Sequence, residues 1–309
     1  DILYIIAKIL IDEPPTFKNK LKSYLGDGLP FPKARASALF DYISENKLYD
    51  TSKETLLEIL NSPNNILGIE YIKSILKLNS NIKPYTINRV NSGYNSLNIN
   101  NSICSASAIR NALKTDSLET INYTMPKPTY DLINDTVNSG VNLVYNDDFY
   151  QILSSIILRD KDNLTDYFEV NEGIENKIYN SIFKCQNIEE LQNEIKSKRY
   201  TMTKISRTLN NIMLGIKRDD ILKTKDLKEM PYVRVLAFND KGCEILKEIK
   251  KNSEIEVITK FSKIKHIDSD IFNTLINYDI KATNMYSLIY NKSLLKGPMD
   301  YITSPKYIK

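Results

Sequence analysis

The amino-acid sequence predicts an α/β protein in two parts, residues 1–124 and residues 125–309. In the first part, helical patterns surround one short strand pattern that carries an arginine near its end. The second part is mainly helical, but a small β-α-β pattern lies near its end. We expect the boundary at Met125-Pro126-Lys127-Pro128, because closely spaced prolines favour a linker between domains.

Residues 1–80 are predicted to be mainly helical. One helical pattern ends before Pro14, and a second covers residues 17–25 before a Gly-Asp-Gly sequence interrupts it. The alanine-rich residues 34–39 favour a third helix. A fourth helix is expected after Asn65. The spacing of its apolar residues predicts one buried face, made of Ile66, Ile69, Ile72 and Leu76.

The next segments gather groups that can bind phosphate. Asn64 lies just before the fourth helix, and the strand expected over residues 85–90 carries Arg89. After a loop rich in Asn, Ser and Gly, another helix is expected to begin near Ser105. Amide and guanidinium groups and the unpaired N–H groups at a helix start all donate hydrogen bonds to phosphate oxygens. The arrangement therefore predicts the phosphate side of a nucleotide site.

The SxSxxR sequence at this helix start suits the β- and γ-phosphates of ATP. In adenylyl transfer pyrophosphate leaves, so an enzyme must neutralise charge on the leaving group. The hydroxyls of Ser105 and Ser107 can donate hydrogen bonds, and Arg110 can bind two oxygens at once. A structural interpretation remains open, in which the serines only cap a helix and Arg110 is solvated. Asn64 could likewise be a helix cap and Arg89 a surface charge.

The second part is helical through about Arg218 and contains a strongly basic segment. Between Glu194 and Arg218 there are seven basic residues and one acid. An apolar face at helical spacing leaves the basic side chains outside, where they either are simply solvated or contact an RNA backbone. Tyr200 could stack on a base. The candidate RNA contacts are Lys196, Lys198, Arg199, Tyr200, Lys204 and Arg207.

The β-α-β element follows this basic segment. Strand patterns over residues 232–238 and 255–259 flank a helical pattern over residues 242–250. Earlier in the second part, Glu172 and Glu175 share one helix face. Because no His or Asp accompanies them in register, we expect these two carboxylates to have a structural role and predict no metal site.

Composition excludes several classes of protein. The net charge of +4 is too small to indicate nucleic acid by itself. Three distant cysteines, Cys104, Cys185 and Cys243, suggest neither disulfides nor zinc and favour a reducing, cytoplasmic setting. No apolar run approaches the length of a membrane span, so no membrane partner is expected. The single histidine, His266, is expected to be a surface residue, and the sequence leaves the oligomeric state open.

The order and wording of these segments resemble the bacterial tRNA(Met) cytidine acetate ligase family, whose nucleotide-binding domain is of the HxGH nucleotidyltransferase type. The resemblance extends over nearly the whole chain. The segments that carry it are LPFPKAR (29–35), SPNNILGIEY (62–71), TINRV (86–90), SASAIR (105–110), EGIEN (172–176), KRYT (198–201) and PYVRVLAFN (231–239).

The resemblance implies the fold, the reaction and the site. The fold would be the C-terminal portion of a Rossmann-like nucleotidyltransferase domain followed by a mainly helical, tRNA-binding domain with a small α/β element. The reaction would activate acetate with ATP as acetyl-adenylate and acetylate N4 of the wobble cytidine of elongator tRNA(Met), with Mg²⁺ accompanying the ATP substrate. DNA is not an expected partner. The residues expected to bind ATP are Asn64, Arg89, Val90, Ser105, Ser107 and Arg110.

Two departures from the family pattern limit this expectation. An HxGH loop needs two histidines and this sequence has one, so we expect the upstream half of the ATP site to be missing and the chain alone to be inactive. Asn95 stands where the family usually has a histidine. The alternatives are an adenylyltransferase that acts on a small metabolite and a non-catalytic RNA-binding fragment. The catalytic residues themselves stay unassigned.

Overall fold

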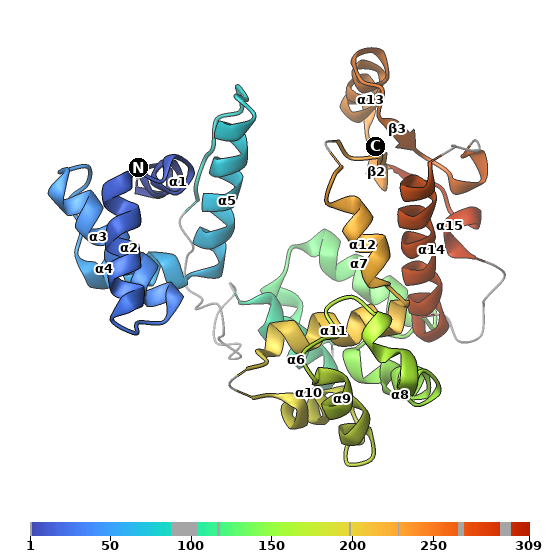
Figure 1. Cartoon of the computed structure of the whole chain (residues 1–309). Helices are drawn as coiled ribbons and strands as arrows, with labels where there is room; N and C mark the ends of the chain where they lie inside the picture. Colours follow the sequence, from blue (N-terminus) through green and yellow to red (C-terminus); the bar gives the residue numbers. More distant parts are fainter. Residues whose placement is uncertain are drawn as a thin grey trace. The chain divides into compact units, whose positions relative to one another are not determined.

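The computed structural model describes residues 2–87, 104–115, 118–197, 199–227, 229–264, 269–290 and 298–309. Over these ranges the chain is mainly helical, with short parallel strands near its C-terminal end (Figure 1). It divides into two compact units, residues 1–92 and 93–309. None of the helices in these ranges combines the length and apolar character needed to cross a membrane.

The first unit is helical throughout residues 2–77 apart from short connections. Three of its helices begin with a proline in the first turn, where the N–H that proline lacks has no helical partner anyway. Helix α1 packs on α5 and α2 packs on α3, around a core of isoleucine, leucine and alanine side chains. The helices are α1 (Ile2–Asp12), α2 (Pro15–Gly26), α3 (Phe31–Glu45), α4 (Lys53–Asn61) and α5 (Pro63–Lys77).

Most of the helices predicted for this unit are confirmed. Helices α1, α2 and α3 cover the expected positions, while α4 was not predicted and begins at a cap in which Ser52 Oγ accepts the Thr55 N–H at 3.1 Å. Helix α5 begins at Pro63, which places Asn64 inside its first turn instead of before it. The expected buried face is only partly correct, because Ile69 and Ile72 are buried whereas Ile66 is 40% exposed.

The strand predicted over residues 85–90 is wrong for the residues that the structure describes. Residues 81–87 have no regular secondary structure, and residues 88–90 lie outside the described ranges. Tyr85 and Ile87 are 88% and 96% exposed. A β-strand needs a partner for its backbone hydrogen bonds, and no described strand pairs with this segment.

The second unit begins with helices and 3₁₀-helices. The largest core cluster of this unit lies among α8, α9, α10 and α11 and is built mainly from isoleucine and leucine. The expected linker around Pro126 instead starts α7, because a proline is well accommodated in a first helical turn. In order, the elements are α6 (Ala106–Thr115), η1 (Leu118–Thr124), α7 (Lys127–Asn138), η2 (Asn146–Phe149), α8 (Tyr150–Arg159), η3 (Lys161–Asp166), α9 (Ile174–Ile182), α10 (Ile188–Ile195), α11 (Met202–Leu214) and α12 (Arg218–Thr224).

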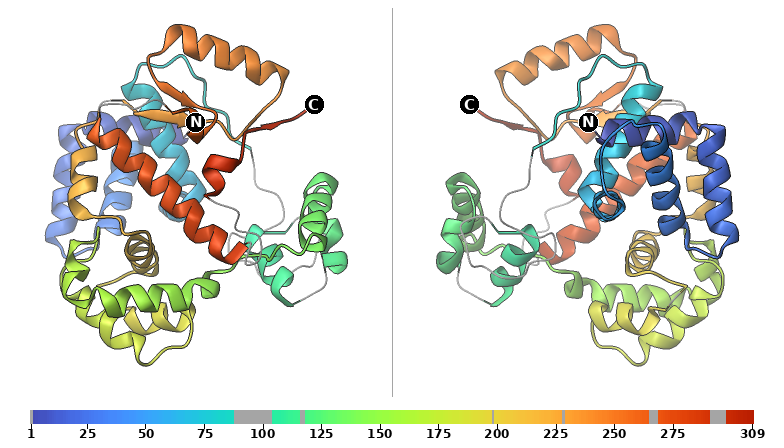
Figure 2. Two further views of the ribbon diagram at one scale, coloured as in Figure 1. Left: turned by 90° about the vertical axis from the view of Figure 1, so that its right-hand side faces the viewer. Right: turned by 90° about the vertical axis from the view of Figure 1, so that its left-hand side faces the viewer.

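The C-terminal part of this unit contains the predicted β-α-β element. Strands β1 (Tyr232–Arg234) and β3 (Glu256–Ile258) are parallel, and α13 (Asp240–Asn252) connects them (Figure 2). The single strand expected over residues 232–238 is in fact split, because β2 (Ala237–Phe238) leaves β1 and pairs in parallel with β4 (Lys306–Tyr307). Between these strands lie η4 (Phe261–Lys263), α14 (Asp270–Tyr290) and α15 (Met299–Ile302).

The boundary between the two compact units lies between residues 92 and 93, which is earlier in the chain than the functional boundary expected between residues 124 and 125. Helix α6 and η1 therefore belong to the compact unit that also holds the basic segment. The expected division into a nucleotide-binding part and a tRNA-binding part concerns function, and it stays a prediction.

Candidate functional site

Helix α6 begins at a buried serine cap. Ser105 is 3% exposed, and its Oγ accepts the Ala108 N–H at 3.0 Å. Ala108 and Ala112 form the buried side of the helix. Ser105 therefore caps the helix, as the structural interpretation of this residue expects. A capping serine accepts a hydrogen bond through its oxygen and still has a hydroxyl proton.

Ser107 and Arg110 lie on the exposed side of the same helix. Because they are three residues apart, their side chains are neighbours on one face of α6. None of the described residues forms an ion pair or hydrogen bond with Arg110. The first turn of α6 thus offers an exposed hydroxyl, a guanidinium group and unpaired backbone N–H groups, which together suit a phosphate group.

Asn64 belongs to the other compact unit, where it is exposed in the first turn of α5. It shares a helix face with Gly68, Tyr71 and Ile75, since these positions are separated by three or four residues. An apolar groove of about 410 Å³ runs along that face beside residues 80–86. The expected ATP contacts Arg89 and Val90, and Asn95, lie outside the described residues.

The basic segment is structured by a buried tyrosine at the start of α11. Tyr200 is 6% exposed, and its hydroxyl donates to the backbone carbonyl of Glu172 at 2.7 Å. Little of its ring remains for a base to cover, so this placement favours a structural role over base stacking. Thr201 caps α11 by accepting the Lys204 N–H at 3.3 Å.

Two glutamates from the connection before α9 pair with the basic side chains of α11. Glu169 accepts two hydrogen bonds from Arg207, at 3.0 Å from Nε and 2.9 Å from Nη2. This bidentate contact raises the pKa of Arg207. Glu172 lies 3.3 Å from Nε of Arg199 and 3.8 Å from Nζ of Lys204. We call residues 167–173 the acidic loop.

The acidic loop is held in an unusual backbone conformation. Glu169 and Glu172 have φ angles of 64° and 61°, which non-glycine residues adopt only when their surroundings impose them. The backbone of Phe168 provides two contacts that hold the loop. Its N–H donates to the Ile216 carbonyl at 2.9 Å, and its carbonyl accepts from the Asn211 side chain at 3.0 Å. The loop is therefore fixed to the C-terminal end of α11.

A second anchor lies at the beginning of the acidic loop. The Tyr167 hydroxyl donates to Asp160, which also pairs with Arg159 at 2.6 Å. Hydrogen bonds from Arg159 and then Tyr167 lower the pKa of Asp160 to about 2. Burial and the hydrogen bond to Asp160 raise the pKa of Tyr167 to about 12. Both shifts keep this contact intact through the neutral pH range.

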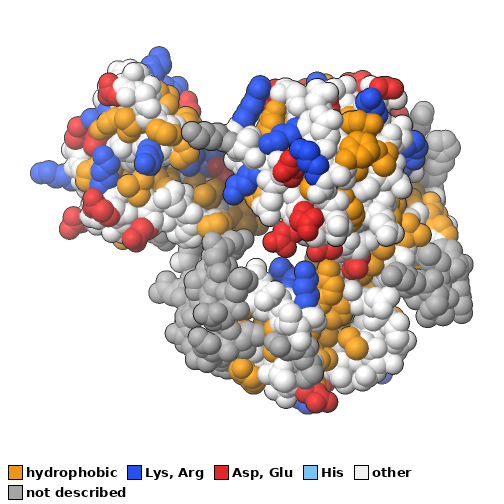
Figure 3. Space-filling view, turned by 90° about the horizontal axis from the view of Figure 1, so that it is seen from below, with side chains coloured by type: hydrophobic (Ala, Val, Ile, Leu, Met, Phe, Trp, Pro, Cys, Tyr) orange, Lys and Arg blue, Asp and Glu red, His pale blue; other side chains and the backbone are white. Residues whose placement is uncertain are grey.

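The remaining predicted RNA contacts are less constrained. Lys196 is exposed and takes part in none of the ion pairs within the described ranges, and Lys198 lies outside those ranges. Figure 3 shows basic and acidic side chains interspersed on the face that it draws. The sequence predicts a structural role for Glu172 but does not single out Glu169. The only feature of the sequence that could have indicated Glu169 is its place in an acidic stretch before the basic segment.

Metal and disulfide chemistry find no support in the described part of the chain. No three His, Cys, Asp or Glu side chains there are grouped so that they could hold a metal ion. Cys104, Cys185 and Cys243 form no disulfide among the described residues. His266 lies outside the described residues.

Comparison with known proteins finds relatives that match nearly the whole chain. The family described as HIGH Nucleotidyl Transferase matches residues 1–298. A tRNA(Met) cytidine acetate ligase of Clostridium perfringens is 43% identical over 306 residues, which are 99% of this chain and 72% of that protein. The protein of the same name from Clostridium acetobutylicum is 45% identical over 301 residues, with coverages of 96% and 70%.

Solved structures show the same fold. The apo structure of Thermotoga maritima TmcAL matches with a TM-score of 0.85 and 28% identity, over 99% of this chain and 74% of that one. A second structure of the Thermotoga maritima protein, bound with alpha-thio ATP, matches with a TM-score of 0.82 and 27% identity. It covers 99% of this chain and 73% of that one.

Proposed function

Because the chain belongs to the HIGH nucleotidyl transferase family and, within it, to the tRNA(Met) cytidine acetate ligases, we propose that it serves ATP-dependent acetylation of tRNA. An acetate oxygen attacks the α-phosphorus of ATP, and pyrophosphate leaves. The N4 amino group of the wobble cytidine in elongator tRNA(Met) then attacks the acetyl carbon of acetyl-adenylate. AMP leaves with the bonding electron pair, and the amino group loses a proton.

The observation that carries this proposal is the exposed pair of Ser107 and Arg110 beside the capped start of α6. These groups would bind the β- and γ-phosphates and stabilise the negative charge that builds up on departing pyrophosphate. Asn64, Arg89 and Val90 would contact the rest of the nucleotide. Mg²⁺ would be held mainly by phosphate oxygens and water, as is usual for magnesium nucleotides.

The tRNA would bind through the basic segment, within the part that we assign to residues 125–309. Lys196 and Lys198 would contact the RNA backbone directly. Arg199, Lys204 and Arg207 would do so by exchanging the carboxylates of the acidic loop for phosphate oxygens. Tyr200 would support these residues from beneath, because it is buried.

The 309 residues hold one histidine, so an HxGH pair has to come from outside them. We therefore expect little or no acetylation by these residues alone. The test is transfer of labelled acetate to an elongator tRNA(Met) transcript, with ATP, by the chain alone and by the chain joined to an HxGH segment from a family member. The matched control is the same transcript with uridine at the wobble position, which has no N4 amino group.

Label on the cytidine transcript alone, with the joined chain, would support the proposal. Label on both transcripts would contradict N4 as the acceptor. Absence of label with every combination, together with ATP-dependent adenylylation of a small metabolite, would favour the small-molecule adenylyltransferase. Absence of any ATP-dependent product, with tRNA binding retained, would favour the non-catalytic RNA-binding alternative.

A further inference from the structure

Helix α9 buries one side in the core of the second unit and exposes the other. Asn180 lies four residues after Asn176 and three residues before Phe183, so these side chains share one face of the helix. Lys177 lies beside them, three residues before Asn180. Lys177 is half-buried and the other three are exposed, and we call the four residues the α9 surface. None of the four is acidic, and the one acid of α9, Glu175, is half-buried.

The aromatic ring of the α9 surface is both exposed and supported. Phe183 is 66% exposed. Its ring centre lies 5.4 Å from that of Tyr179, and the two rings meet edge to face at 78°. Nζ of Lys161 lies 4.8 Å from the centre of the Tyr179 ring. Phe183 thus presents most of its ring to water while Tyr179 holds it in place, which suits the stacking of a second flat group.

The lysines near this ring have no acidic partner in the described part of the chain. Lys161 is exposed and forms no ion pair there. Nζ of Lys177 donates to the backbone carbonyl of Lys196 at 3.3 Å, and neither of these two lysines has an acid beside it within the described ranges. Neighbouring cations without an acid attract an anion. Through Lys196 the α9 surface is also continuous with the basic segment.

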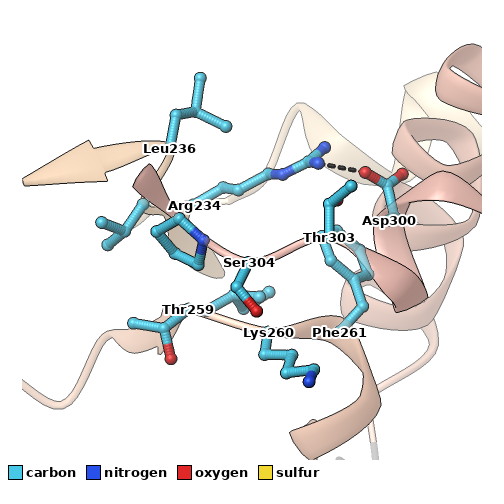
Figure 4. Close-up of a pocket in the computed structure, with 11 residues that line it drawn as sticks. Arg234, Leu236, Thr259, Lys260, Phe261, Asp300, Thr303 and Ser304 are labelled. Carbon is cyan, nitrogen blue, oxygen red and sulfur yellow. Dashed lines mark hydrogen bonds and ion pairs between the residues drawn. The ribbon is translucent and has the colours of Figure 1, made fainter. Parts of the chain in front are cut away.

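Other cations of the second unit are already held by acids. Arg234 donates to Asp300, and the two side chains point toward one another in Figure 4. Lys184, directly after Phe183, pairs with Glu194 at 3.1 Å. The arginines at the start of α11 and within it pair with the acidic loop. Each of these cations reaches a phosphate only by exchanging its partner, whereas the lysines without an acidic partner need no exchange.

This combination of side chains suits single-stranded nucleic acid. Surfaces that bind it place cations along the backbone and aromatic rings under the bases. Amide side chains add hydrogen bonds to the sugar and phosphate groups. Protein interfaces are depleted in lysine, so a protein partner fits this surface less well. Within a paired RNA helix the bases stack on each other, whereas unpaired bases can stack on an aromatic side chain.

We propose that the α9 surface binds an unpaired stretch of RNA. One base stacks on Phe183, and Lys177 contacts a phosphate. The RNA is an unpaired segment of the tRNA, and in this respect the inference rests on the proposed function. The RNA-binding surface then includes α9 as well as the basic segment, and it binds through stacking as well as through charge.

Tryptophan fluorescence tests the stacking directly. The chain contains no tryptophan, so Phe183→Trp introduces a single indole at the stacking position. We expect an elongator tRNA(Met) transcript to bind this variant with retained affinity and to quench its emission, because a base stacks on the indole. Phe31→Trp is the matched control, since Phe31 is 53% exposed and lies in the other compact unit. Bound transcript that leaves Phe183→Trp unquenched, or that quenches both variants equally, would overturn the inference.

Affinity measures what the ring contributes. Phe183→Leu keeps an apolar side chain beside Tyr179 but has no aromatic ring. It is expected to weaken binding of the transcript about tenfold, as for one lost stacking contact, without changing the slope of log K against log salt. A fully paired RNA duplex should bind Phe183→Leu and the unmodified chain equally. Phe31→Leu should bind the transcript like the unmodified chain. An equal loss for the duplex and the transcript would contradict stacking on an unpaired base.

The salt dependence tests the phosphate contact. Lys177→Gln should weaken binding and make the slope of log K against log salt shallower by about 1. Lys241→Gln is the control, because Lys241 is exposed on α13 and has no ion pair among the described residues. An unchanged slope with Lys177→Gln, or the same change with Lys241→Gln, would overturn the contact assigned to Lys177.

A single-stranded oligouridylate separates this inference from the proposed function. If the transcript does not bind but the oligouridylate does, and Phe183→Leu weakens that binding about tenfold, the α9 surface is an RNA site and the proposed function fails. If the transcript binds the unmodified chain and Phe183→Leu equally well, the proposed function stands and the inference fails. If neither RNA binds, both fail.

Discussion

Helix α6 and helix α11 both present arginine side chains on an exposed face, but the surroundings of these arginines differ. Arg110 on α6 has no ion-pair partner among the described residues. Arg207 on α11 makes a bidentate contact with Glu169, and the preceding Arg199 lies beside Glu172. As far as the described residues go, no acid has to be displaced for a phosphate to approach Arg110, whereas near α11 the phosphate must compete with two carboxylates.

The difference follows from how each surface is built. The exposed face of α6 depends only on local helix geometry and on the Ser105 cap. The surface of α11 depends on an acidic loop far away in the sequence, whose two glutamates have positive φ angles. Such conformations cost on the order of 1–3 kcal/mol each and persist only when tertiary contacts impose them. The fold thus places acids beside these cations and lowers their net charge.

The largest effect is expected from Arg110→Ala. The guanidinium is already exposed, and a hydrogen bond to a charged group contributes about 1.5–3 kcal/mol, so ATP affinity should fall about 10- to 150-fold. Isothermal titration of ATP into the 309-residue chain measures this change. Where the unmodified chain binds ATP too weakly to measure, the titration is made with the chain joined to an HxGH segment.

Lys114→Ala is the matched control for this change. Lys114 lies in the last turn of α6, and its Nζ is 4.9 Å from the centre of the Tyr145 ring. Its removal takes the same charge from the same helix, one turn beyond Arg110 and outside the first turn. Equal losses of ATP affinity in the two variants would show that α6 acts only through its overall charge, and the contrast with α11 would then lose its meaning.

Local sequence patterns predicted much of this molecule. Helices α1, α2, α3 and α5, the start of α6 and the β-α-β element all follow from periodicity, caps and turn residues within each segment. The same local patterns misled at residues 85–87, whose alternation resembles a strand although no described strand pairs with them. A segment forms a β-strand only when another strand is available to pair with it, and the sequence of the segment alone does not show whether such a partner exists.

The residues of the candidate site show the same difference between contacts within one element and contacts between separate elements. Ser107 and Arg110 could be placed together from their spacing alone, because they are neighbours on one helix. The contact between Glu169 and Arg207 joins residues from separate elements, and so does that between Arg234 and Asp300. No spacing rule connects such pairs. A count of charges along the basic segment therefore overstated how much positive charge its surface presents.

Removing the acidic charges near α11 should make its surface resemble that of α6. In the double variant Glu169→Gln and Glu172→Gln, three basic side chains lose their acidic partners. Exposed ion pairs in the weaker half of their usual range contribute about 0.2–0.5 kcal/mol each, so the loss of all three should let tRNA bind about three- to tenfold more tightly at low salt. The slope of log K against log salt should also become steeper, by about 1 to 2, as further phosphates are contacted.

Glu189→Gln is the control for the double variant, because Glu189 is exposed on α10 and takes part in none of the ion pairs of the described residues. It lowers the negative charge without releasing a basic side chain of α11. The same gain in affinity with Glu189→Gln would mean that only the net charge matters. Weaker tRNA binding by the double variant would show that the acidic loop positions the arginines for RNA.

The smallest effect is expected from Tyr200→Phe. This change tests whether Tyr200 contacts RNA or only supports the fold beneath the basic surface. The change deletes the hydroxyl that donates to the Glu172 carbonyl at 2.7 Å. Loss of this bond should lower the free energy of unfolding by about 0.5–1.5 kcal/mol, measured by urea denaturation. Tyr123→Phe, at a tyrosine that is 52% exposed, should change it little. Because Tyr200 is buried, tRNA affinity should be retained by both variants. If Tyr200→Phe instead lowered tRNA affinity without changing the free energy of unfolding, the Tyr200 hydroxyl would contact the RNA. The basic segment would then bind RNA through a neutral hydrogen bond as well as through its charges.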